Sequence, residues 1–198
     1  MGKSMFLRKV QASVRSVPLD RPRAIVIAAY LDTLAFGASL NAAGIYIDII
    51  KQVEEELFRL GALPSDCPST VHAFARYMNE ENRAFRAALL ELLGRSSFPF
   101  RVVVLIDEIQ PVLRSPWGRG FCDNLRQLLT NEPDISSYLD VVIAGAKEMV
   151  EIAVDIGSPL ANVLSWKHLE LFSYSETSAL VSKCRRNINY SYMIGYLS

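Results

Sequence analysis

The pattern of apolar and polar positions is most pronounced in one stretch near the middle of the chain. Residues 101–108 read Arg-Val-Val-Val-Leu-Ile-Asp-Glu, so five apolar residues in a row end in two carboxylates. Such a run is typical of a strand that is buried on both faces, as in the parallel sheet of an α/β domain. Ligands of these sheets bind just beyond the carboxyl ends of the strands, which makes Asp107 and Glu108 candidate site residues. A buried strand that stops at a solvated acidic turn would give the same pattern.

Further apolar runs predict strands over residues 23–30, 140–145 and 166–172. Asp32 and Thr33 follow the first of these runs. For these two residues we favour capping of the next segment over a ligand role, because Asp and Thr side chains readily accept hydrogen bonds from backbone N–H groups where a helix begins.

Between these runs, apolar residues recur at the spacing of amphipathic helices. The spacing predicts helices over residues 4–16, 45–60, 69–93, 120–129, 147–155 and 175–184, and a loop over 109–119. In the second of these helices, the acidic triplet Glu54-Glu55-Glu56 is predicted to lie on the solvent-exposed side. Alternating helices and short apolar strands predict an α/β fold with a parallel sheet.

The first residues of the chain form the second candidate element. Gly2-Lys3-Ser4, followed by an amphipathic segment, resembles the second half of a phosphate-binding P-loop, G-x-x-x-x-G-K-[ST]. In such a loop the backbone N–H groups at the helix start favour phosphate, the lysine reaches the β- and γ-phosphate oxygens, and the hydroxyl binds Mg²⁺. Gly-Lys-Ser is common by chance. Together with the acidic strand end, however, it predicts a Walker A and Walker B pair.

Composition narrows the classes of function. The chain has 198 residues, of which 51% are hydrophobic, enough for one domain with a sizeable core. Its 21 basic residues balance 21 acidic ones, so no basic excess indicates nucleic acid as a partner. No apolar run is long enough to cross a membrane, and the basic start leads into an amphipathic segment. We therefore expect a soluble, cytoplasmic protein.

Several motifs together resemble the AAA-like ATPase domains of prokaryotic STAND-type NTPases. Besides Gly2-Lys3-Ser4, they are Val-Leu-Ile-Asp-Glu-Ile-Gln at 104–110, Asp-Asn-Leu-Arg-Gln-Leu-Leu at 123–129, Val-Ile-Ala-Gly at 142–145 and Gly-Ser-Pro-Leu at 157–160. The resemblance covers residues 1–182, expected to form an incomplete ATPase domain, and leaves 183–198 as an unassigned tail. It implies a three-layer P-loop NTPase fold of the AAA type, with helices on both faces of a parallel sheet.

The resemblance also implies a role for each candidate residue. Gly2, Lys3 and Ser4 would bind the phosphates of ATP, and Ser4 and Asp107 would hold Mg²⁺. Glu108 would polarise the attacking water. Relatives carry a polar sensor residue at the end of the fourth strand, but this sequence has Gly145-Ala146 there. The arginine that completes the site in relatives is not assigned by the motifs; Arg119 and Arg126 are the candidates.

A full P-loop needs a strand and a first glycine before Gly2, where this sequence has only Met1. We therefore expect the reading frame of a longer parent protein to continue upstream and to encode a strand and a glycine-rich turn. In an AAA-type sheet this first strand lies centrally. Without it, we expect the chain to be poorly stable and to bind ATP weakly or not at all.

The function expected from this resemblance is an ATP-binding and ATP-hydrolysing switch domain of a larger signalling or defence-type protein. Its expected partners are the nucleotide, the other domains of the parent chain and, in a nucleotide-dependent homo-oligomer, further copies of itself. Two alternatives stay open. One is a nucleic-acid-associated AAA ATPase, such as a replication or transposition helper, and the other is a non-catalytic interaction fragment.

Overall fold

The computed structural model describes residues 2–14, 25–77, 80–146, 160 and 163–165. The chain divides into two compact units, Met1–Leu164 and Ser165–Ser198, and all the helices and strands given below belong to the first. Several sequence-based expectations lie outside the described residues: the strand over 166–172, the helices over 147–155 and 175–184, and the domain boundary near Ser182.

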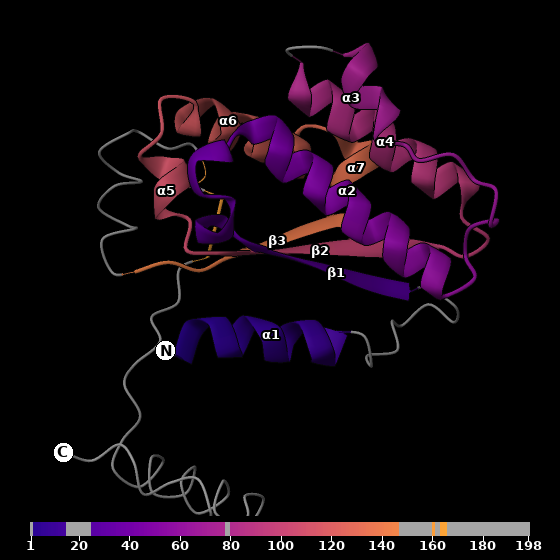
Figure 1. The fold of residues 1–198 in the computed structure, drawn as a ribbon, viewed down its shortest axis with the longest axis horizontal. Coiled ribbons are helices and arrows are strands. Elements are labelled where there is room, and N and C mark those ends of the chain that lie inside the picture. The colour runs from indigo at the N-terminus through magenta and orange to yellow at the C-terminus, as the bar shows by residue number, and fades with distance from the viewer. Residues whose placement is uncertain (1, 15–24, 78–79, 147–159, 161–162, 166–198) are drawn as a thin grey trace, which may run out of the picture. The chain divides into compact units, whose positions relative to one another are not determined.

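In the described part of the chain, three parallel strands form a sheet in the order β1-β2-β3 (Figure 1). They are β1 (Ile25–Asp32), β2 (Phe100–Asp107) and β3 (Leu139–Ile143). The register pairs Asp32 at the end of β1 with Asp107 at the end of β2. The predicted parallel sheet is confirmed for these strands, and its carboxyl edge places two aspartates side by side.

Helices cover both faces of this sheet, so the first unit has three layers (Figure 1). α1 (Gly2–Val14) lies on one face. The other face is covered by α2 (Ala42–Arg59), α4 (Glu81–Arg95) and α6 (Gly118–Thr130). The α/β class and the helices on both faces are therefore as predicted.

Short helices complete the unit: η1 (Thr33–Ser39), α3 (His72–Arg76), α5 (Gln110–Leu113) and α7 (Pro133–Ser136). The single helix predicted over 69–93 is two helices, α3 and α4, because the backbone leaves the helical region at Tyr77 and at Glu80. The loop predicted over 109–119 contains α5, where Pro111 occupies the first turn, a position that tolerates its missing N–H.

The core beneath α2, α4 and α6 is built around Tyr46 of α2. Its ring centroid lies 4.8 Å from that of Phe85 on α4 and 5.4 Å from that of Phe121 on α6. All three side chains are buried, and each contributes about 2–3 kcal/mol of apolar burial. This one cluster therefore joins the three helices of the layer.

Within the described part of the chain, the opposite face is covered less completely. Leu7 of α1 packs in one cluster with Ala28 of β1 and Leu105 of β2, and Gln11 Nε2 donates to the Ala28 carbonyl over 3.3 Å. The side chains packed against this cluster are only partly buried: Val10, Tyr30, Val103, Val142 and Ala144. α1 is thus attached to the centre of the sheet by a small apolar contact.

The predicted solvent exposure of the acidic triplet is wrong for two of its members. Glu54 and Glu56 are buried, and Glu55 alone is exposed. Glu54 accepts hydrogen bonds from the backbone and hydroxyl of Thr70 and from the hydroxyl of Ser69. The helical spacing could not reveal this, because the connector that folds back over α2 supplies these donors.

Candidate functional site

Asp107 lies at the carboxyl end of β2 with only 1% of its surface exposed. The Tyr30 hydroxyl donates to its Oδ2 over 2.9 Å, and the backbone N–H of Glu108 donates to its Oδ1 over 3.1 Å. A carboxylate buried without such donors would be strongly destabilising. Each carboxylate oxygen has two lone pairs, so these two bonds orient the group and leave it capacity to bind a further ligand.

Tyr30 is held by contacts with Gln52, Arg8 and Asp107. Its backbone N–H donates to Gln52 Oε1 and its carbonyl accepts from Gln52 Nε2, both over 2.8 Å. The guanidinium carbon of Arg8 lies 5.3 Å from the centroid of the tyrosine ring. Burial, followed by the hydrogen bond to Asp107, raises the pKa of the Tyr30 hydroxyl, so the group stays a donor at neutral pH.

Glu108 is the single non-glycine residue with a positive φ in the described part of the chain, at 53°. This left-handed conformation costs about 1–2 kcal/mol for a residue with a Cβ atom. The Thr33 hydroxyl donates to the Glu108 carbonyl and so supports the turn. Residues held in such conformations concentrate at functional sites, where the surrounding structure over-determines them.

The side chain of Glu108 reaches the start of α1. Its Oε1 lies 3.7 Å from Lys3 Nζ, and both side chains are 31% exposed. This ion pair joins the two motifs that the sequence singles out, the Gly-Lys-Ser start and the Asp-Glu strand end. At this exposure it contributes about 0–1 kcal/mol, too little for its main effect to be stability.

α1 offers donors as well as the lysine. It begins at Gly2, contains no acidic residue in its first turn, and carries the half-buried Ser4 directly after Lys3. The first backbone N–H groups of an α-helix lack intrahelical partners and carry the positive end of the helix dipole. This end of α1 is therefore suited to an anion that competes with Glu108 for Lys3.

The donor set fits one kind of metal site and not another. Among the residues that the structure describes, no group of three or more His, Cys, Asp or Glu side chains is placed to hold a metal ion. Magnesium in phosphate sites needs no such cage, because one or two carboxylates suffice when phosphates and waters supply the other oxygens. Asp107, with acceptor capacity to spare, has the chemistry for this second arrangement, and so does the Ser4 hydroxyl, although no contact among the described residues joins the two.

Of the remaining sequence candidates, Asp32 has the capping role that was predicted, and the two arginines are not placed at the site. Asp32 Oδ1 accepts from the backbone N–H of Leu34 over 3.1 Å at the start of η1, which confirms its predicted capping role. Gly145 and Ala146 follow Ala144, whose backbone bonds to Ile106 and Ile109 beside the end of β2. Arg119 and Arg126 are both exposed on α6, and no contact places either at Asp107 or Glu108 in the described part of the chain.

Sequence reasoning missed two contributors: Tyr30 and Gln52. Tyr30 and Gln52 act through contacts between segments far apart in the chain, and no local pattern marks them. Gln110 follows the acidic pair by two residues and is buried, and its Oε1 lacks a hydrogen-bond partner among the described residues.

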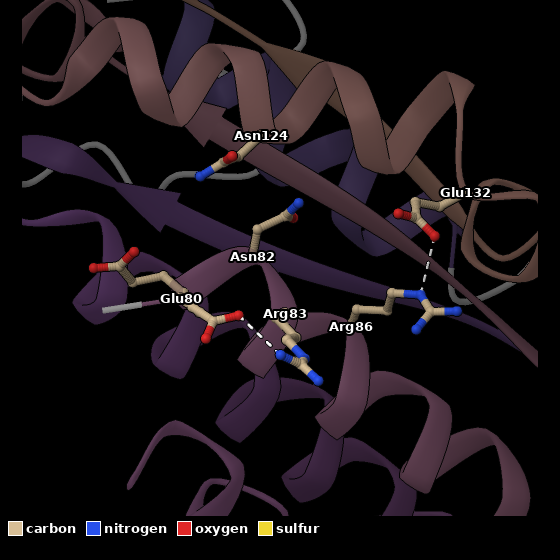
Figure 2. Close-up of a pocket in the computed structure, with 7 residues that line it drawn as sticks. Glu80, Asn82, Arg83, Arg86, Asn124 and Glu132 are labelled. Atoms are coloured by element: carbon tan, nitrogen blue, oxygen red, sulfur yellow. Dashed lines mark hydrogen bonds and ion pairs between the residues drawn. The ribbon is translucent and has the colours of Figure 1, made fainter. Parts of the chain in front are cut away.

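A separate pocket of about 480 Å³ lies between α4 and α6 and shares no residue with this site (Figure 2). Its arginines are already paired, Arg83 with Glu80 over 3.1 Å and Arg86 with Glu132 over 3.1 Å. The lining residues are Glu80, Glu81, Asn82, Arg83, Arg86, Asn124 and Glu132. Because these charges neutralise one another, the pocket presents no unpaired arginine to an anion.

The helices that the structure describes include none with the length and apolar character needed to span a membrane. Comparison with protein-family models, with curated proteins and with solved structures finds no match to this chain. Any functional conclusion therefore rests on the geometry of Lys3, Asp107 and Glu108 and on the motifs in which they occur.

Proposed function

We propose that this chain is part of a P-loop-type switch domain that binds ATP with Mg²⁺ and hydrolyses it slowly within a larger signalling or defence-type protein, and that nucleotide binding is impaired in the chain on its own. The observation that carries the proposal is the contact between Lys3 and Glu108. It brings the start of α1 to the carboxyl end of β2, which is where ligands of parallel sheets bind. The resemblance to AAA-like domains of STAND-type NTPases supplies the substrate class.

Different residues would bind the phosphates and the metal ion. Lys3 and the first N–H groups of α1 would neutralise the β- and γ-phosphates, while Ser4 and Asp107 would hold Mg²⁺. When bound, the ion supplies charge neutralisation at the transferred phosphoryl group. A γ-phosphate that binds Lys3 releases Glu108 from its ion pair, so the carboxylate becomes available when substrate is present.

Glu108 would then act as the residue that orients and deprotonates the attacking water. The water oxygen forms a bond to the γ-phosphorus, the bond from that phosphorus to the bridging oxygen of ADP breaks, and Glu108 takes the proton. The products are ADP and inorganic phosphate. Phosphoryl transfer depends mainly on positioning and charge stabilisation, so these few side chains can provide the core of such a site.

The test is a titration with a fluorescent ATP analogue and Mg²⁺, with phosphate release measured in parallel. Lys3→Ala should weaken nucleotide binding by about tenfold or more, because a cation that contacts phosphate directly is lost. Glu108→Gln should bind nucleotide as tightly as the unaltered chain, or up to about fivefold more tightly, because Lys3 is released from its ion pair. Its turnover should fall strongly, since the base is lost.

Lys9→Ala is the matched control, because Lys9 is an exposed lysine of the same helix. It should change neither binding nor turnover. The series is measured on this chain and, if the reading frame continues upstream of Met1, on the extended form. Absence of nucleotide binding in both forms at millimolar concentration would refute the proposal and favour a non-catalytic interaction domain.

A further inference from the structure

We infer that Tyr30 is a positioning residue for Asp107, whose carboxylate it holds in the orientation that binds Mg²⁺. The inference rests on the proposed function, since it concerns the metal affinity of that same site. The Tyr30 hydroxyl donates to Asp107 Oδ2 over 2.9 Å, and Asp107 Oδ1 is held by the backbone of Glu108. Donors on both oxygens fix the rotation of the carboxylate about its own axis.

The surroundings of Asp107 explain why the Tyr30 hydroxyl is the donor to its carboxylate. Asp107 is 1% exposed, so bulk water has little access to its oxygens. In the parallel register Tyr30 pairs with Leu105, and Asp107 is the next residue along β2 on the same face of the sheet. A long phenol at position 30 therefore reaches diagonally to the carboxylate, whereas a shorter side chain would stop short of it.

Tyr30 is itself immobilised by contacts that do not involve the carboxylate. Gln52 of α2 binds both its backbone N–H and its carbonyl, and Arg8 of α1 lies over its ring. Because the backbone and the ring of Tyr30 are both held, its hydroxyl loses little conformational freedom when it orients the Asp107 carboxylate. Partners that orient metal ligands in this way typically change metal affinity by about 10- to 100-fold when they are removed.

α1 consequently contacts one acidic residue of the site directly and the other through Tyr30. Lys3 pairs directly with Glu108, and Arg8 acts on Asp107 through the ring and hydroxyl of Tyr30. The helix that would bind the phosphates is thus also the helix that steadies the metal ligand. A shift of α1 would change the nucleotide and metal subsites together.

The experiment compares Tyr30→Phe with the unaltered chain and measures the Mg²⁺ concentration that gives half-maximal binding of a fluorescent ATP analogue. Direct binding of Mn²⁺, followed by electron paramagnetic resonance, gives a second readout that does not depend on turnover. Tyr30→Phe should raise both midpoints by about tenfold or more. Analogue binding in EDTA should stay the same, because the ring is kept, whereas the urea unfolding midpoint should fall, because the buried Asp107 carboxylate loses one donor.

Tyr138→Phe is the matched control: it makes the same chemical change at an exposed tyrosine next to the opposite end of the sheet, and it should alter nothing. If Tyr30→Phe does not fold, Arg8→Ala takes its place. That variant should raise the Mg²⁺ midpoint about two- to fivefold, because it removes only the cation over the ring.

Two results would overturn the inference and leave the proposed function intact. One is a Mg²⁺ midpoint for the tested variant within about 1.5-fold of that of the unaltered chain. The other is an equal loss of binding in EDTA, which would show a general structural role. If the unaltered chain and its extended form bind neither the nucleotide analogue nor Mn²⁺, the proposed function fails, and the positioning role fails with it.

Discussion

Glu108 combines a left-handed backbone with a charged side chain that pairs with Lys3. Glycine is the residue best suited to such a backbone position, and glutamate is not among the residues enriched there. The conformation is nevertheless supported by the Thr33 hydroxyl, which donates to the Glu108 carbonyl. A strained residue with a weak ion pair is hard to explain by stability alone, which agrees with the proposed role of its carboxylate in the reaction.

This strain predicts an ordering of two variants that both lack the carboxylate. Glu108→Gly should be more stable than Glu108→Ala by about 0.5–1 kcal/mol. Alanine keeps the left-handed penalty of about 1–2 kcal/mol, whereas glycine avoids it and loses part of the gain to its greater freedom in the unfolded chain. Urea unfolding measures the difference. Equal stabilities, or a more stable alanine variant, would contradict the assigned backbone strain.

At the scale of elements, a side chain of α2 forms hydrogen bonds with the backbone at the outer edge of β1. Gln52 of α2 donates to one backbone group of Tyr30 and accepts from the other, as a neighbouring strand would. Unpaired backbone groups at a sheet edge are a template for association with other chains. α2 therefore both covers one face of the sheet and protects its edge at the residue that contacts Asp107.

Gln52→Leu should destabilise the chain by about 1–2 kcal/mol, because two partly buried backbone groups of Tyr30 lose their partners. Gln127→Leu on α6 is the control, since Gln127 is exposed and its replacement should change the free energy of unfolding by less than about 0.5 kcal/mol. Chemical denaturation compares the two. Similar small effects would show that water replaces the amide at the edge.

At the scale of the whole first unit, the aromatic cluster on one face of the sheet contains a destabilising polar group. The Tyr46 hydroxyl is buried and has no hydrogen-bond partner among the residues that the structure describes. Burial, with smaller contributions from Cys122 and Glu81, raises the pKa of this hydroxyl. The ring joins three helices, whereas the hydroxyl adds a desolvated polar atom to their shared core.

Tyr46→Phe should therefore stabilise the chain by about 1 kcal/mol at neutral pH, because the ring contacts remain and the unpaired hydroxyl is removed. The gain should grow above about pH 10. There the unfolded chain loses the Tyr46 proton while the folded chain keeps it, so the unaltered protein loses about 1.4 kcal/mol of stability per pH unit from this group. A difference between the two proteins that does not change between pH 8 and pH 11 would contradict the raised pKa.

The chain's own residue pattern was enough to locate the described strands and the longer described helices. The apolar run ending at Asp107 became β2, and the runs on either side became β1 and β3, because burial on both faces leaves an uninterrupted apolar stretch. Periodicity failed where a helix broke in mid-pattern, as at Tyr77. It also failed where a short helix formed inside an expected loop, as at Gln110–Leu113.

Only part of the candidate site could be predicted from the sequence, because a sequence pattern reports neighbouring residues and not the contacts between distant segments. Lys3, Asp107 and Glu108 belong to local motifs, so their chemistry could be proposed from neighbouring residues alone. The contact between Lys3 and Glu108, the hydroxyl of Tyr30 on Asp107 and the burial of Glu54 depend on strand register and on how distant segments pack. Local sequence determines which groups a site can use, whereas tertiary packing decides which of them meet, because those contacts join residues that no local pattern connects.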